Sequence, residues 1–192
     1  MKTITSTIKN IYYPPGGILM WIIIYLELIT FCMAMLAMAY YNLEEPNVFH
    51  ESRLLLNANY GVLNTVFLLT SGFFMAISVN EVKARNREKA KRYVLLTICF
   101  GTLFLILKSV EYYAKIEAGL SIGYNTFFSF YWMLTLFHVI HVIIGLVILS
   151  SVYLSLKHKK ELVLEDIEAS AAFWHMCDLI WLLLFPIIYL LF

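Results

Sequence analysis

The chain has 192 residues, of which 61% are hydrophobic and only 14% are charged, and its mean hydropathy is +0.78. A soluble domain could not bury that much apolar surface, so the composition excludes a soluble globular protein and predicts an integral membrane protein. The net charge of +1 gives no electrostatic basis for binding nucleic acid.

The chain opens with a polar tail, residues 1–16, whose last part contains Pro14 and Pro15. Prolines suit an extended lead-in but not the interior of a helix. The remainder, 17–192, contains five apolar runs, and each is long enough to cross a ~30 Å hydrocarbon layer at ~1.5 Å per residue. They lie at about 17–40, 58–79, 93–114, 127–153 and 171–191. We therefore predict an all-α membrane protein with one domain of five transmembrane helices.

The connections between these runs predict the orientation. The second connection, 81–92, carries six basic and two acidic residues, and the fourth, 157–168, is also rich in charge and is typical of a short amphipathic surface helix. The first, 41–57, is an acidic loop. With five spans, both basic connections lie on one side of the membrane. The positive-inside rule then places the N-terminus in the cytoplasm and the C-terminus outside.

Small residues within the spans are assigned to packing. The three cysteines, Cys32, Cys99 and Cys177, lie in apolar runs without a CxxC spacing, so neither disulfides nor a zinc site is expected. Four glycines are expected to let helices approach closely, as small residues do in lipid. They are Gly61, Gly72, Gly101 and Gly145.

Polar side chains at membrane depth are the candidate functional residues, because such groups usually face the interior of a bundle. Glu27 lies near the predicted midplane of the first span. His138 and His141 are three residues apart in the fourth span, so both imidazoles lie on one helix face. Because His141 and Glu27 are predicted at similar depth, we expect them to form a hydrogen-bonded pair.

Two further pairs are spaced by three residues. Lys108 and Glu111 lie near the outer end of the third span, and we interpret them as an ion pair whose ends reach toward the interface. His175 and Asp178 lie near the cytoplasmic end of the fifth span. Asn64 lies near the outer end of the second span.

A metal or haem site built from these histidines and carboxylates is an alternative. Predicted depth disfavours it, because His138 lies ~22 Å and His175 ~6 Å from the cytoplasmic interface. Two axial ligands of one haem cannot differ so much in depth. We therefore expect these side chains to join helices, with Glu27 as a candidate proton relay and no metal ligands.

Motifs in all five spans resemble subunit III of the haem–copper oxidases, the cytochrome c and quinol oxidase family. The fifth span is the most specific, because E-A-S-A-A-F-W-H-M-C-D-L-I-W at 168–181 is similar to the family pattern E-x-x-A-x-Y-W-H-F-V-D-x-x-W. The fourth, T-L-F-H-V-I-H-V-I-I-G at 135–145, resembles T-G-x-H-x-x-H-V-x-x-G. The third, 101–112, is similar to G-x-x-F-x-x-x-Q-x-x-E-Y. The first has Trp21 upstream of Glu27, and the second has Asn64 followed by threonine.

The chain departs from the family pattern at several positions. Leu26 stands where a small or hydroxyl residue usually precedes the glutamate, Lys108 replaces glutamine and Leu136 replaces glycine. The fuller members carry two additional N-terminal helices that form one wall of a lipid-filled cleft. This chain resembles the five-helix members that lack that pair.

The resemblance implies an accessory subunit without catalytic residues, in a terminal oxidase that couples oxygen reduction to proton translocation. In this family, haem and copper belong to subunits I and II, so no cofactor is expected on this chain, although phospholipid is. Subunit III packs mainly against subunit I, and it is thought to steady the active site, sustain proton uptake and help oxygen reach that site. Glu27 corresponds to a buried glutamate known in the family for reactivity toward carbodiimide.

The expected partners are therefore subunits I and II and membrane lipids, and the expected location is a bacterial cytoplasmic membrane, although a mitochondrially encoded member would look alike. Three tryptophans, Trp21, Trp174 and Trp181, are predicted to lie at interfaces or against lipid. The alternatives are an accessory subunit of a nitric-oxide reductase, a membrane haem or diiron enzyme, and a small transporter that uses Glu27. The absence of an internal repeat disfavours the transporter.

Overall fold

The structure of the protein is a computed structural model that describes residues 16–158 and 164–191. Its helices are α1 (Ile18–Glu44), α2 (Pro46–Leu54), α3 (Ala58–Lys83), α4 (Arg87–Glu117), α5 (Thr126–Lys157), α6 (Leu164–Pro186) and the π-helix η1 (Ile187–Leu191). Within the described residues, five helices are long and apolar enough to cross a membrane: α1, α3, α4, α5 and the continuous α6–η1. The prediction of an all-α, multi-pass membrane protein with five spans is confirmed.

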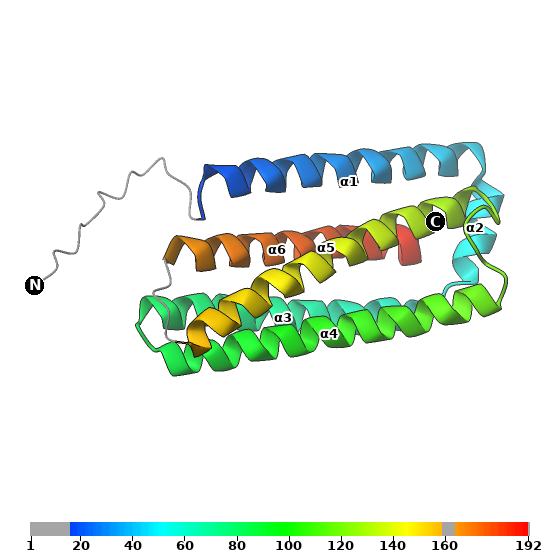
Figure 1. Cartoon of the computed structure of the whole chain (residues 1–192). Helices are drawn as coiled ribbons and strands as arrows, with labels where there is room; N and C mark the ends of the chain where they lie inside the picture. Colours follow the sequence, from blue (N-terminus) through cyan, green and yellow to red (C-terminus); the bar gives the residue numbers. More distant parts are fainter. Residues whose placement is uncertain (1–15, 159–163, 192) are drawn as a thin grey trace, which may run out of the picture.

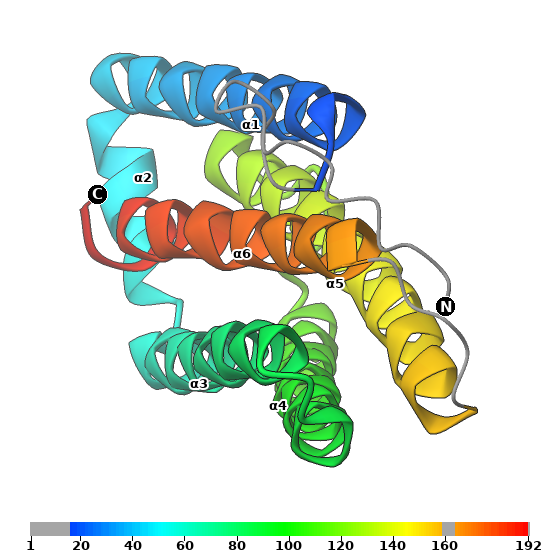
Figure 2. The same cartoon turned by 90° about the vertical axis from the view of Figure 1, so that its left-hand side faces the viewer.

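The helices lie in two layers (Figures 1 and 2). One layer holds α1, α6 and α3 side by side, with α6 in the middle, and the other holds α5 and α4, with α5 crossing obliquely over α6. The centre of the fold is therefore α6, which packs on α1, α3 and α5. Trp174 and Trp181 of α6 are fully buried, and their rings contact residues of α4 and α5. His175, Leu179 and Leu182 of the same helix are exposed.

The helices extend beyond the apolar runs that predict them. The third span begins at Arg87 and the fourth ends at Lys157, because charged residues continue a helix past the hydrocarbon layer. The fifth begins at Leu164, so Glu165 and Asp166 occupy its first turn, where carboxylates interact favourably with the helix dipole. The predicted tail up to residue 15 and the middle of the charged connection, 159–163, lie outside the described residues.

The acidic connection 41–57 is not only a loop, as predicted, but contains the short helix α2 (Figure 1). Pro46 occupies its first turn, where a missing N–H costs nothing. Phe49 is fully buried and contacts the ring of Phe127, with centroids 5.5 Å apart. Asn125 caps α5 through Phe128 and donates a 2.7 Å hydrogen bond to Ser52. A buried ring and a polar contact thus hold α2 across the end of the bundle.

Glycines at helix contacts make room for large side chains, as the sequence predicts. A Cβ at Gly101 of α4 would lie 2.7 Å from the indole of Trp174, and one at Gly145 of α5 would lie 2.8 Å from the same indole. Trp174 is fully buried, and its Nε1 donates a 3.1 Å hydrogen bond to Ser71 of α3. One tryptophan of α6 thus joins three neighbouring helices.

Polar contacts fix the end of the bundle that is predicted to face the cytoplasm. Arg87, at the start of α4, donates hydrogen bonds of 2.8 and 2.7 Å to the carbonyls of Leu156 and Ser155 at the end of α5. Lys83, at the end of α3, forms a 2.8 Å ion pair with Glu168 of α6. The basic connection therefore also joins helices, in addition to its predicted role in orientation.

The glycine contacts lead to a stability prediction. Gly101→Ala should lower the free energy of unfolding by about 1–3 kcal/mol, because the added methyl group overlaps the indole of Trp174. SDS-induced unfolding in mixed micelles measures the change. The adjacent control, Thr102→Leu, adds more volume on the exposed face and should change stability by less than about 0.5 kcal/mol. Equal stability of Gly101→Ala and the unchanged protein would contradict the packing.

Candidate functional site

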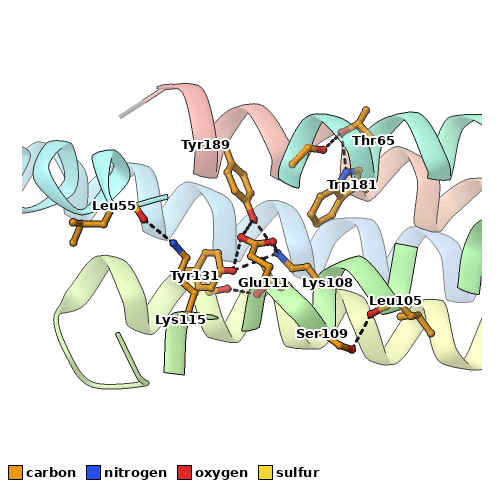
Figure 3. Close-up of polar contacts among 12 residues, drawn as sticks. Leu55, Thr65, Leu105, Lys108, Ser109, Glu111, Lys115, Tyr131, Trp181 and Tyr189 are labelled. Atoms are coloured by element: carbon orange, nitrogen blue, oxygen red, sulfur yellow. Dashed lines mark hydrogen bonds and ion pairs between the residues drawn. The ribbon is translucent and has the colours of Figure 1, made fainter. Parts of the chain in front are cut away.

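A buried polar cluster joins α4, α5 and η1 (Figure 3). Nζ of Lys108 donates to Oε2 of Glu111 at 3.0 Å and to the hydroxyl of Tyr189 at 2.9 Å, with the hydroxyl of Tyr131 at 3.4 Å. The other carboxylate oxygen of Glu111 accepts hydrogen bonds from Tyr131 at 2.9 Å and from Tyr189 at 2.5 Å. Each hydroxyl can therefore donate to Glu111 while it accepts from Lys108.

The rings around Lys108 add to this stabilisation. Its Nζ lies 5.1–5.5 Å from the ring centroids of Tyr112, Tyr131, Trp181 and Tyr189, within the range of a cation–π interaction. The side chains of Lys108 and Glu111 are 0% and 1% exposed. A buried ion pair has to recover the cost of leaving water, and these hydrogen bonds and rings supply the compensation.

The geometry of η1 brings Tyr189 to this cluster. Pro186 has no backbone N–H, and its ring clashes with the preceding turn, so a regular α-helix does not continue through it. The chain goes on as the π-helix Ile187–Leu191, and Tyr189 lies inside that turn with its hydroxyl pointing at Glu111 (Figure 3). Single π turns are frequent at functional sites.

The interpretation of Lys108 and Glu111 as a pair that reaches toward the interface is therefore wrong. The two side chains are neighbours, as predicted, but they point into the bundle. The physical reason is that two tyrosine hydroxyls from other helices satisfy them there. Tyr131 and Tyr189 are not among the site residues that the sequence predicts. The available signal was the pair itself, because a Lys and a Glu inside a span require hydrogen-bonding groups from neighbouring helices.

The predicted contact between Glu27 of α1 and His141 of α5 is present, with Nε2 of His141 3.1 Å from Oε2 of Glu27. Nδ1 of His141 lies 2.8 Å from the carbonyl oxygen of Phe137, which can only accept, so Nδ1 carries a hydrogen. A hydrogen bond between Nε2 and Glu27 then requires one further proton, on either group. This contact joins α1 and α5.

The other histidine of α5, His138, has a different environment. It is fully buried, its ring stacks on Trp181 with centroids 5.4 Å apart, and the edge of Phe104 approaches it at 5.7 Å. Neither of its nitrogens has a hydrogen-bond partner among the described residues, and the same is true of the buried amide of Asn64 on α3. A buried polar atom left unpaired costs about 1–3 kcal/mol. His138 and Asn64 are thus among the described side chains whose buried polar atoms stay unsatisfied.

The third pair, His175 and Asp178 of α6, is in contact, with Nδ1 3.2 Å from Oδ2. The carboxylate is buried against Gly72 of α3, where a Cβ would overlap Oδ2. His175 is 44% exposed. This pair is thus half inside the bundle and half on its surface.

The tryptophans differ from the prediction that they lie at interfaces or against lipid. Trp174 and Trp181 are fully buried, and Nε1 of Trp181 donates a 2.9 Å hydrogen bond to Thr65 of α3 (Figure 3). An indole satisfies its single donor equally well at a membrane interface and against a hydroxyl in a bundle, so its presence in a span does not distinguish the two. Trp21 is partly exposed near the start of α1, beside Tyr25.

The residues of the metal-site hypothesis are divided among separate contacts. Glu27 pairs with His141, His175 pairs with Asp178, and His138 lies between aromatic rings. In the part of the chain that the structure describes, no group of three or more histidine, cysteine, aspartate or glutamate side chains is placed to hold a metal ion. The arrangement supports contacts between helices.

A protein-family model matches most of the helices described above. The model of cytochrome c oxidase subunit III matches residues 53–191, which include α3, α4, α5, α6 and η1. The chain belongs to the cytochrome c oxidase subunit III family. The resemblance seen in the motifs is confirmed, but the match begins at residue 53 and does not include α1, where Glu27 and Trp21 lie.

Individual members of the cytochrome c oxidase subunit III family agree. Cytochrome c oxidase subunit 3 of Paracentrotus lividus is 36% identical over 135 residues, which are 67% of this chain and 49% of that protein. The protein of the same name from Rhipicephalus sanguineus is 33% identical over 132 residues, with the same two shares. That of Mycosarcoma maydis is 34% identical over 130 residues, or 67% of this chain and 46% of that protein. The chain thus spans about half the length of these relatives.

The buried cluster of this family member gives a second prediction. Lys108→Met should lower the free energy of unfolding by about 3–5 kcal/mol, because it leaves Glu111 without its cation. The double variant Lys108→Met with Glu111→Gln removes both charges and should regain more than half of that loss, since the two tyrosines can still bond to the amide. SDS unfolding of the single and double variants tests the coupling. Additive losses would show that the two charges do not depend on each other.

The contact between α1 and α5 gives a third prediction. Glu27→Gln keeps a hydrogen-bonding partner for His141 and should leave stability nearly unchanged, whereas Glu27→Leu should cost about 1–2 kcal/mol. In a His141→Leu background, Glu27→Leu should have no comparable effect, because the contact is already lost. The same loss in both backgrounds would mean that Glu27 stabilises the fold through some other group.

Proposed function

We propose that the chain acts as subunit III of a respiratory haem–copper terminal oxidase, a complex that couples oxygen reduction to proton translocation. The observation that carries the proposal is the family match over 53–191, which covers four of the five membrane-spanning helices. In the proposed complex the chain binds subunit I as its main contact and also meets subunit II and membrane lipids. The relatives carry the same assignment in their names.

The role we propose for the chain is to stabilise subunit I, without catalytic residues of its own. The polar pairs at membrane depth support this role, because Lys108 with Glu111 and Glu27 with His141 are engaged with neighbouring helices. Such contacts give a rigid surface against which another subunit can pack. Haem and copper are assigned to subunits I and II, and phospholipid to the apolar outer surface of the bundle.

We assign support of proton uptake to Glu27. Its side chain is 27% exposed, so it is reachable from outside the bundle, and its Oε2 lies 3.1 Å from Nε2 of His141. A protonated carboxyl group within hydrogen-bonding distance of a neutral imidazole can transfer its proton to the ring, and the carboxylate and imidazolium that result remain in contact as an ion pair. The helix that carries Glu27 also lies at one edge of its layer, where a neighbouring subunit can reach it (Figure 2). Access of oxygen along the apolar face is part of the same proposal.

The multi-pass helices place the chain in a membrane, and we propose the bacterial cytoplasmic membrane as its location. The orientation follows from the basic connections, with the N-terminus on the cytoplasmic side. The turn between α3 and α4 supports it, because Lys83, Arg85 and Arg87 lie together at one end of the bundle, the same end as the start of α6 (Figure 1).

The decisive experiment is to purify the full chain with an affinity tag from its native membrane in a mild detergent. We expect a haem-containing protein to co-purify and the preparation to reduce oxygen, with cytochrome c or quinol as the electron donor. The reduced-minus-oxidised spectrum and the copper content identify the partner. A co-purified complex that reduces nitric oxide and not oxygen would contradict the proposal, and so would a Soret band that stays with this chain after its partners are removed.

A further inference from the structure

The face of α6 that points away from α5 and α4 is an unusual surface for a membrane helix. His175, Leu179 and Leu182 follow one another at spacings of four and three residues, so they form one stripe, and all three are exposed. Leu69 of α3 is also exposed and shares a helix face with Gly72, which contacts the same stripe. We call these four side chains, His175, Leu179, Leu182 and Leu69, the α6 patch. The helix α6 itself lies between α1 and α3 in the first layer (Figure 2).

The polar centre of the patch is incompletely satisfied. Nδ1 of His175 contacts Oδ2 of Asp178, but Nε2 has no hydrogen-bond partner among the described residues. Oδ1 of Asp178 is buried and also has no partner there. Nε2 of His175 lacks a partner in both neutral tautomers of the ring. When Nδ1 carries the hydrogen and donates it to Asp178, Nε2 is an unpaired acceptor, and when Nδ1 accepts a hydrogen, Nε2 is an unpaired donor. The patch therefore presents one outward hydrogen-bonding atom in an apolar stripe.

The depth of His175 makes acyl chains a poor neighbour for this atom. His175 lies seven residues, about 10 Å along the helix, beyond Glu168, and about 6 Å inside the predicted apolar span. Hydrocarbon cannot satisfy an imidazole nitrogen, and a polar residue at such depth normally meets a polar group of another helix. The pair cannot withdraw into the bundle, because Gly72 already contacts both side chains.

We propose that the α6 patch is the docking surface for a transmembrane helix of a partner subunit, and that this helix presents a polar side chain to Nε2 of His175. The inference rests on the proposed function, since it names the surface through which the chain joins its complex. The partner's apolar side chains pack on Leu179, Leu182 and Leu69, and its polar side chain completes the His175–Asp178 pair. The partner helix and the α6 patch would thus be complementary in polarity, with a single hydrogen bond surrounded by apolar contacts.

Photo-crosslinking in the assembled complex tests the surface without altering His175. The photoreactive residue p-benzoylphenylalanine is placed at Leu179 or Leu182 in the full chain, and at Ile106 or Val110 on the exposed face of α4 as controls. After irradiation of native membranes, we expect adducts with a subunit of the co-purifying haem protein from the α6 positions, severalfold more than from the α4 positions. Adducts with lipid alone, or with a second copy of this chain, would overturn the inference.

Substitutions test the hydrogen bond itself. His175→Leu should weaken retention of the haem protein about threefold to thirtyfold during washing in detergent, which is the range for one hydrogen bond between membrane helices. His175→Gln places an amide near the position of Nε2 and should retain most of the binding. Leu179→Ala, which removes only apolar contact, is the matched control and should lose less than His175→Leu. Equal retention by His175→Leu and the unchanged chain would overturn the role of this nitrogen.

The two proposals fail in different ways. If no haem protein co-purifies with the unchanged chain, the proposed function and the docking surface both fall. If it co-purifies normally while the α6 positions give no adducts with it and the α4 positions do, the function stands and the docking surface is wrong.

Discussion

The structure depends on one constraint: hydrocarbon offers a polar side chain no hydrogen-bond partner, so such a side chain inside a membrane is stabilised by polar groups of the protein. In the cluster around Lys108 and Glu111, groups from several helices meet this requirement. An ion pair on α4 draws hydroxyls from α5 and from η1, and four aromatic rings surround the ammonium group. The π turn after Pro186 is part of the same solution, since it brings Tyr189 to the carboxylate.

The same constraint explains why α6 is central. Its indoles reach Ser71 and Thr65 on α3, and glycines on α4 and α5 give the indole of Trp174 room. Its acidic start pairs with Lys83 at the end of α3. Helix association in lipid cannot rely on removing apolar surface from water, so close packing and hydrogen bonds carry it. One pair on α6, His175 with Asp178, leaves Oδ1 of Asp178 and the outward Nε2 of His175 without partners among the described residues, and that outward nitrogen is the basis of the proposed docking surface.

Much of this could be predicted from the sequence, and the failures have physical causes. Apolar length predicts the five spans, and matching depth predicts the contact of Glu27 with His141, since both follow from the rise of a helix. The direction in which Lys108 points depends on hydroxyls 23 and 81 residues away, which local spacing does not reveal. Trp174 and Trp181 were placed at interfaces because an indole suits either environment, and α2 was missed because one buried ring stabilises it.

The central claim is that the buried polar side chains of this chain serve contacts between helices within a larger membrane complex. A cryo-EM structure of the complex purified through this chain tests it most directly. The account predicts that Lys108, Glu111 and Tyr189 lie within hydrogen-bonding distance of one another, and that the exposed face of α6 is covered by a helix of a haem-containing subunit. A map in which Lys108 and Glu111 point toward lipid, or in which this chain itself holds the haem, would contradict it.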